Sequence, residues 1–244
     1  MHKKLALFYH PMCPFAQRIL HVINYKEIEV TLKQLDLSQE NEWYFKLNPE
    51  NFTPALQVTT EGKSLFLRDS LVIARYLETL KSPYLYSRDS DGQGVSLENS
   101  LIDKKIQSDI EPLRKVIGLV YNEPDPTPAQ LSQFKSIAEK VNFSVPDGRF
   151  FNDQLFGKNE LSFIDLMALP LIERVIAFKD LNLKYYENCE ISSLIRWYNT
   201  LSSLSFVKTS QTPLQRYINL RSSILNKSYK GLVLPLSNYD TPSN

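Results

Sequence analysis

Within the first 80 residues, short apolar runs alternate with segments of helical periodicity, in an order that few folds accommodate. The pattern predicts strands at 5–9, 28–32, 52–58 and 64–68, and helices at 14–24, around Trp43 and at 70–80. The last two strands flank a turn at Gly62 and are close enough in sequence to pair as an antiparallel hairpin. The first two need a right-handed crossover through the intervening helix, and the chain is long enough for one.

The resulting order, β-α-β-α-β-β-α, is that of a thioredoxin-like α/β domain. A polar segment rich in turn-forming residues follows at 81–94 and is typical of a linker. Beyond it we find no strand pattern, and helical periodicity runs through 96–121, 127–142, 162–178, 191–203 and 212–225. We therefore expect a thioredoxin-like domain at 1–80, a linker at 81–94 and an all-helical domain at 95–244 that ends in an irregular tail.

Charge and cysteine content argue against several classes of protein. The chain has 28 Lys and Arg against 27 Asp and Glu, so it lacks the basic surface of a nucleic-acid-binding protein. Its two cysteines cannot form a disulfide framework, which favours a reducing, cytoplasmic location. The first apolar run is too short for a signal peptide, and no run is long enough to span a bilayer. No histidine or cysteine group has the spacing of metal ligands, so we expect no metal.

Cys13 follows the first predicted strand directly, and Pro14 begins the next helix. Unpaired backbone N–H groups and the helix macrodipole stabilise an anion there, so we predict a reactive thiolate with a pKa below the usual value of about 8.5. Ala16 stands where a C-x-x-C motif has its second cysteine. An active site here therefore has one thiol and must take the other from a small molecule. The alternative is that Cys13 is an inert, buried, apolar side chain.

Two other residues bear on this thiol chemistry. His10 lies three residues before Cys13 and is either a donor to the thiolate or a solvated loop residue. Cys189 has acidic neighbours and no proline after it, so we expect it to have a structural role or none.

Two further elements of the first 80 residues suit a peptide-like anionic ligand. Thr53 precedes Pro54 at the start of a strand, which suits a cis peptide bond that turns the Thr53 backbone outward to pair with a peptide. Asp69 and Ser70 open the third helix, where N–H groups and a hydroxyl can receive a carboxylate, although the pair can also serve simply as a cap. A thiolate, a peptide-pairing edge and a carboxylate pocket are what glutathione requires.

Several stretches that occur together carry a family resemblance. They are CPFAQR at 13–18, EWYFKLNP at 42–49, TPAL at 53–56 and DSLVIARYLE at 69–78. In the second half, 156–175 contains Ser162-x-x-Asp165, a capping box at the start of a core helix. With these stretches the sequence resembles the cysteine-type glutathione transferases, most closely the omega class, and the capping box resembles the folding motif of that family.

The resemblance implies a homodimeric, two-domain enzyme that uses glutathione as co-substrate. The activities that it implies are thiol transfer, dehydroascorbate reduction and removal of glutathione from mixed disulfides, in detoxification and redox balance. Cys13 would be the nucleophile that forms a mixed disulfide with glutathione. Thr53 would pair with the cysteinyl backbone of glutathione, and Asp69 with Ser70 would hold its γ-glutamyl end. The remaining contacts would come from Phe15 and Pro54.

The sequence departs from the omega pattern in the hairpin around Gly62, which is longer than usual, and at two positions of the site. A gapless match puts Glu40 where the omega class has a lysine for the glycyl carboxylate, which leaves Lys33 or Lys46 to supply that charge. Leu214 falls where relatives tend to carry a tryptophan in the second-substrate pocket. Arg174 either faces the second substrate or forms a structural ion pair at the domain interface.

Two other classes of protein share these features. One is a non-enzymatic relative similar to chloride intracellular channel proteins, which have a CPF motif and a thioredoxin-like start but associate with membranes. The other is a ligand-binding protein with the glutathione transferase fold and no catalysis. The lack of a long apolar segment in the first 50 residues and the match at 156–175 favour the enzyme, with a small electrophilic or disulfide second substrate.

Overall fold

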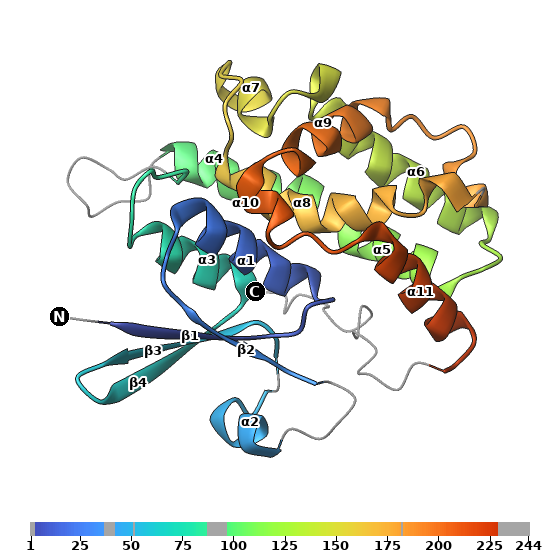
Figure 1. The fold of residues 1–244 in the computed structure, drawn as a ribbon. Coiled ribbons are helices and arrows are strands. Elements are labelled where there is room, and N and C mark those ends of the chain that lie inside the picture. The colour runs from blue at the N-terminus through green and yellow to red at the C-terminus, as the bar shows by residue number, and fades with distance from the viewer. Residues whose placement is uncertain (1–2, 37–41, 51, 87–96, 182, 229–244) are drawn as a thin grey trace, which may run out of the picture.

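The computed structural model describes residues 3–36, 42–50, 52–86, 97–181 and 183–228. Four strands form one sheet, namely β1 (Lys4–Tyr9), β2 (Thr31–Gln34), β3 (Ala55–Thr60) and β4 (Lys63–Arg68). Their order is β2-β1-β3-β4, with β1 and β2 parallel and the other pairs antiparallel. Helices α1 (Pro14–Lys26) and α3 (Ser70–Glu78) cover one face, and α2 (Glu42–Leu47) lies on the other side (Figure 1). The predicted thioredoxin-like domain is confirmed.

Side chains along β1 divide between two apolar clusters, because successive residues of a strand face opposite sides of the sheet. Leu5 and Leu7 belong to a large cluster that includes residues of α1 and α3 and continues into the helical half. Phe8 belongs to a smaller cluster with Ala55 and Tyr44, whose ring comes from α2. The sheet is therefore packed on both faces.

β2 begins at Thr31 rather than at residue 28, so the predicted start is wrong. Glu27 ends α1 in a left-handed conformation with φ of 48°. The N–H of Ile28 then donates to the carbonyl of Ile23 (3.1 Å), which completes the end of the helix. Ile28 and Val30 pack against the core, and this burial accounts for their apolar pattern.

The rest of the described chain contains no strand and is mainly helical. The helices are α4 (Leu97–Lys105), α5 (Leu113–Asn122), α6 (Pro128–Phe143), α7 (Phe151–Phe156), α8 (Phe163–Ile176), α9 (Ser192–Ser202), α10 (Ser205–Lys208) and α11 (Leu214–Leu225). A π-helical turn at Ile106–Ile110 joins α4 to α5, so the helix predicted at 96–121 is in three parts. The short α7 and α10 were not predicted. The linker boundaries and the tail from 232 stay predictions, since much of the linker and all of the tail lie outside the described residues.

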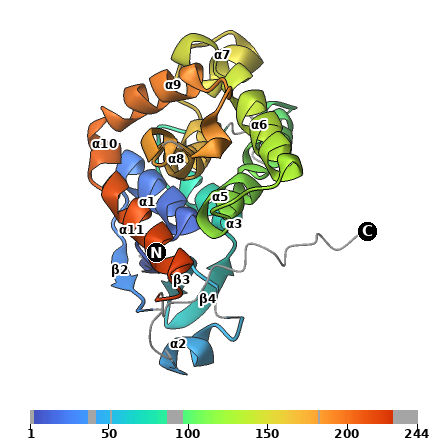
Figure 2. The same cartoon turned by 90° about the vertical axis from the view of Figure 1, so that its right-hand side faces the viewer.

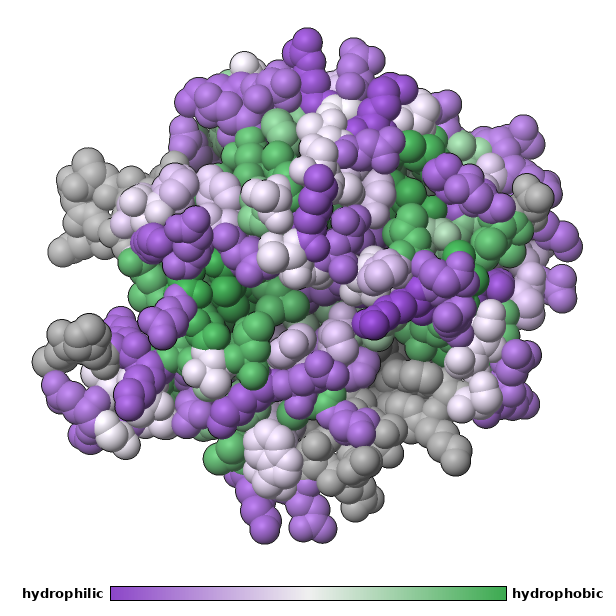
Figure 3. Space-filling model, viewed as in Figure 1, coloured by the Kyte–Doolittle hydropathy of each residue, from purple (hydrophilic) through white to green (hydrophobic). Residues whose placement is uncertain are grey.

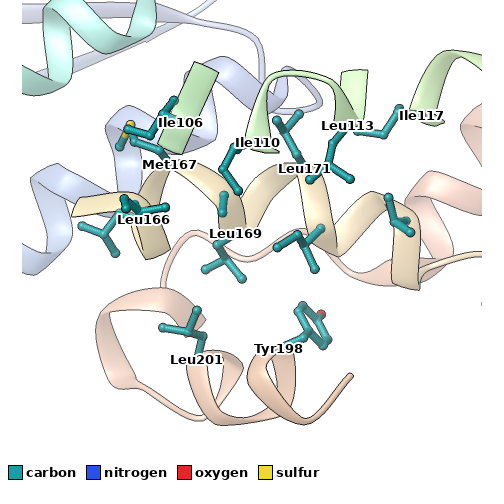
Figure 4. Close-up of a cluster of buried hydrophobic side chains, with 14 of the residues drawn as sticks. Ile106, Ile110, Leu113, Ile117, Leu166, Met167, Leu169, Leu171, Tyr198 and Leu201 are labelled. Atoms are coloured by element: carbon teal, nitrogen blue, oxygen red, sulfur yellow. The ribbon is translucent and has the colours of Figure 1, made fainter. Parts of the chain in front are cut away.

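α8 is the centre of the helical half. All of its residues are buried, and the other helices surround it (Figure 2). Figure 4 shows Leu166, Leu169 and Leu171 of α8 between Ile110 of the π-helical turn and Leu201 of α9. α1 packs against α8 and joins the two halves of the molecule.

The face in Figure 3 is largely polar, with a band of apolar surface between the sheet and the helices above it. Within the described ranges, the structure has no helix with the length and apolar character needed to cross a membrane.

The predicted capping box at the start of α8 is confirmed and has further partners. Both the N–H and the hydroxyl of Ser162 donate to Asp165 Oδ2 (2.8 and 2.5 Å). The other oxygen, Oδ1, accepts from the Phe151 N–H (3.2 Å) and from Trp197 Nε1 (2.8 Å). Burial nevertheless raises the pKa of the Asp165 carboxyl to about 6. Asp165 thus holds α7 and α9 against α8.

We expect Asp165→Ala to destabilise the protein by on the order of 3 kcal/mol, because it removes the cap and leaves the buried Phe151 N–H and Trp197 Nε1 without their acceptor. The matched control is Thr127→Ala, which removes the exposed capping box of α6 and should cost about 1 kcal/mol. Chemical denaturation of both variants measures the difference. Equal losses would contradict the additional role of Asp165.

Candidate functional site

Cys13 lies between β1 and α1, as predicted. It is the N-cap of the helix, with Pro14 as the first helical residue, and its carbonyl accepts from the Gln17 N–H (3.1 Å). Its N–H donates to the carbonyl of His10 (3.0 Å), so the loop before the helix is tightly closed. The thiol itself does not cap the helix.

The Cys13 thiol instead contacts the segment before β3. The Thr53–Pro54 peptide bond is cis, which confirms the geometry predicted from the sequence. Cys13 Sγ donates to the carbonyl oxygen of Thr53 (3.4 Å). The segments around Cys13 and Thr53, which are 40 residues apart in the chain, therefore meet at this hydrogen bond.

Burial raises the pKa of the Cys13 thiol, so the predicted lowering is wrong. The side chain is only 2% exposed, and loss of water disfavours the thiolate. The helix N-terminus acts as expected, because the N–H groups of Ala16 and Phe15 lower the pKa, as do the charges of Arg174 and Arg18. These effects oppose the shift from burial and do not outweigh it.

Neither His10 nor Cys189 takes part in this contact. His10 Nδ1 accepts from the Met12 N–H (3.3 Å), and partial burial lowers the pKa of its imidazole. Cys189 is half-buried and free, and burial together with Glu139 raises the pKa of its thiol to about 11.

Asp69 and Ser70 stand at the start of α3, and each has a hydrogen-bond partner within the protein. Asp69 Oδ1 accepts from the N–H groups of Leu71 (2.8 Å) and Val72 (3.1 Å), so the capping role left open by the sequence is present. Asp69 has a φ of 70°, a conformation that costs energy for a residue other than glycine and that recurs at functional sites. The Ser70 hydroxyl is buried and accepts from Arg18 Nη1 (3.3 Å).

Arg18 is a residue of this site that the sequence reasoning missed. It is 1% exposed and donates through Nε to the Met167 carbonyl of α8 (2.8 Å), while Nη2 pairs with Glu111 Oε1 (2.8 Å). Its guanidinium lies 5.1 Å from the ring centre of Phe15, and that of Arg114 lies 5.3 Å from the same ring. Arg18 belongs to the CPFAQR stretch, but only the fold shows that it is buried beside Ser70.

Arg174 and Leu214, the two residues predicted for the second-substrate pocket, differ in burial and in their contacts. Arg174 is 3% exposed and donates to the carbonyls of Pro170 (2.5 Å) and Met12 (2.7 Å), so it joins α8 to the loop before Cys13. Leu214 begins α11, where it is half-buried against the large apolar cluster. Of the two readings of Arg174, the contact at the domain interface is present, although its partners are carbonyls rather than an acid.

The glycyl end of the predicted ligand site is less defined. Glu40 lies outside the described residues. Lys33 is exposed on β2 with its ammonium 5.1 Å from the ring centre of Phe8, and Lys46 is exposed in α2. Among the described residues, no three His, Cys, Asp or Glu side chains gather in a way that could hold a metal ion.

The chain is similar to several known proteins. Residues 12–80 match the family described as "Glutathione S-transferase, N-terminal domain". Glutathione S-transferase omega-1 of Sus scrofa is 35% identical over 68% of this chain, and the match spans 65% of that protein, less than two thirds of its length. Glutathione S-transferase L1 of Arabidopsis thaliana is 27% identical over 85% of this chain and 81% of its own.

Among solved structures, glutathione transferase Omega 1C from Trametes versicolor superimposes with a TM-score of 0.71. The match covers 92% of this chain and 98% of that chain at 18% identity, so it shows a shared fold.

We expect alkylation of Cys13 by iodoacetamide to have its pH midpoint above that of a free cysteine, because burial disfavours the thiolate. Mass spectrometry of the two cysteine peptides gives the rate at each pH, normalised to its plateau, with Cys189 as the internal comparison. A midpoint for Cys13 below that of free cysteine would show that the helix N-terminus outweighs burial.

Proposed function

We propose that this chain, which matches the N-terminal domain of the glutathione S-transferases at 12–80 and shares the fold of a solved glutathione transferase over 92% of its length, is a glutathione-dependent thioltransferase of omega type. Its substrates are small disulfide or electrophilic compounds, including glutathione mixed disulfides and dehydroascorbate. A cytoplasmic homodimer belongs to the same proposal. The observation that carries it is the contact of Cys13 Sγ with the Thr53 carbonyl at the N-terminus of α1.

In this reaction the Cys13 thiolate attacks the glutathione sulfur of a mixed disulfide. A bond forms between the two sulfurs, and the other half of the substrate leaves as a thiolate that takes up a proton. The thiolate of a second glutathione then attacks the sulfur of the bound glutathione. This step releases oxidised glutathione and restores the Cys13 thiolate. One protein thiol is enough, which agrees with Ala16 in place of a second cysteine.

Glutathione would lie along the backbone at Thr53, with its γ-glutamyl end at Asp69 and Ser70. Its cysteinyl N–H would donate to the same Thr53 carbonyl that accepts from the Cys13 thiol. A second donor at that carbonyl weakens the hydrogen bond that holds Cys13 in its neutral form, so binding favours the thiolate. The Cys13 pKa that burial raises in the free protein is thus compatible with thiolate chemistry in the complex.

A second candidate function is the ligand-binding protein without catalysis. The burial of Cys13 favours it, since a nucleophile must meet its substrate. Measuring glutathione binding and mixed-disulfide turnover on the same preparation separates the two functions. Binding without turnover would favour this second candidate.

Cys13→Ser is expected to abolish reduction of a glutathione mixed disulfide while glutathione affinity changes by only a few-fold, because binding depends on the backbone and on α3. Cys189→Ser is the matched control and should retain wild-type turnover, since this thiol lies apart from the contact at Thr53. Turnover is followed by formation of oxidised glutathione, and affinity by calorimetry. Wild-type turnover by Cys13→Ser would show that the nucleophile is wrongly assigned.

A further inference from the structure

Arg174 reaches from α8 to the residue that immediately precedes Cys13. Its Nη2 donates to the Met12 carbonyl (2.7 Å), across the junction between the helical half and the sheet domain. Nη1 donates to the Pro170 carbonyl of its own helix (2.5 Å). The guanidinium thus uses one nitrogen to fix its position on α8 and the other to hold the loop.

The Arg174 guanidinium also lies over the aromatic ring of Tyr217. The Arg174 Cζ atom lies 4.6 Å from the ring centre, and the ring itself is fully buried. The Tyr217 hydroxyl donates to Glu173 Oε2 (2.8 Å) and accepts from Gln17 Nε2 (3.1 Å). Gln17 lies one turn after Cys13 in α1, so α8 and α11 contact the chain on both sides of the cysteine.

We propose that Arg174 is a positioning residue for Cys13: from α8 it holds the Met12 carbonyl and thereby fixes the loop that presents the thiol at the N-terminus of α1. The inference rests on the proposed role of Cys13 as the nucleophile. It gives Arg174 a function in the reaction without contact to the second substrate. Arginine suits this role because its planar guanidinium presents donors to the two carbonyl oxygens in a fixed arrangement, whereas a lysine ammonium is a single point charge on a flexible stem.

The charge of Arg174 acts in the same direction. It lowers the pKa of the Cys13 thiol, and so does Arg18 from α1. Tyr44, which interacts electrostatically with Cys13, has its pKa raised by burial to about 12 and stays neutral at working pH. The positive charge of Arg174 therefore favours the thiolate of Cys13, while its hydrogen bond to Met12 holds the loop before that residue.

The titratable groups that face Arg174 come from four elements. On α1, burial and then Arg174 lower the pKa of His21 to about 3, so this imidazole is neutral at working pH. On α11, burial raises the pKa of Tyr217 to about 12, and on α5 burial raises that of Tyr121. Glu173 is beside Arg174 on α8, where burial raises the pKa of its carboxyl and Arg174 opposes the shift.

The test compares Arg174→Gln, which removes the charge and the planar guanidinium, with Arg174→Lys, which keeps the charge alone. The matched control is Arg221→Gln. Arg221 is on α11 and donates through Nε to the Val120 carbonyl (2.7 Å), so its loss removes an arginine–carbonyl hydrogen bond between helices away from the Cys13 loop. For each variant we would measure the melting temperature, the pH midpoint of Cys13 alkylation and the turnover of a glutathione mixed disulfide.

We expect Arg174→Gln to raise the alkylation midpoint above that of the wild type and to lower turnover at least several-fold. Arg174→Lys should have an alkylation midpoint close to that of the wild type, because it keeps the positive charge. Its turnover should stay close to that of Arg174→Gln, because the lysine lacks the planar guanidinium. Arg221→Gln should lose stability with its midpoint and turnover unchanged. A midpoint for Arg174→Gln equal to that of Arg221→Gln would overturn the inference. The alkylation midpoint does not depend on glutathione turnover, so a wild-type protein without turnover would refute the proposed function and leave this measurement intact.

Discussion

The complete burial of α8 is the constraint on which the rest of the structure depends. A charged side chain cannot be buried without partners, because loss of hydration costs several kcal/mol. α8 carries three such side chains, and each one has at least one partner on another element. Asp165 accepts from α7 and α9, Glu173 from Tyr217 of α11, and Arg174 donates to the loop before Cys13. The requirement to satisfy these groups fixes the elements around α8.

The same requirement explains how two halves of different architecture form one site. α1 contributes Gln17 and Arg18, both 1% exposed, whose partners lie on α8, on α11 and near the start of α5. Arg18 also donates to Ser70, so the guanidinium that joins α1 to α8 holds the start of α3. Movement of the helical half would therefore disturb both the thiol and the proposed glutathione contacts. We therefore regard the contacts between α1 and the helical half as part of the candidate site.

Local patterns in the sequence were sufficient to predict most of the fold. The order of strands and helices, the cis bond before Pro54 and the capping box at Ser162 each depend on residues close together in the chain. The errors have causes that lie far apart in sequence. The predicted start of β2 is wrong because Ile28 packs, half-buried, against the core without pairing in the sheet, and the raised Cys13 pKa follows from packing by distant segments. For the same reason no local pattern shows that Arg18 and Arg174 are buried where their charges act on Cys13.

The opposition between burial and the helix N-terminus at Cys13 has a consequence for how glutathione would act there. In the free protein the neutral thiol has an acceptor, the Thr53 carbonyl, whereas the thiolate would lose that hydrogen bond and gain only partial compensation from N–H groups and two arginines. A ligand that donates to the Thr53 carbonyl competes with the thiol for it, so ligand binding and loss of the thiol proton favour each other. Coupling of this kind is reciprocal, and the thiolate must then bind the ligand more tightly than the thiol does. The burial of the Cys13 side chain, which is 2% exposed, would also limit its reaction with oxidants before such a ligand binds.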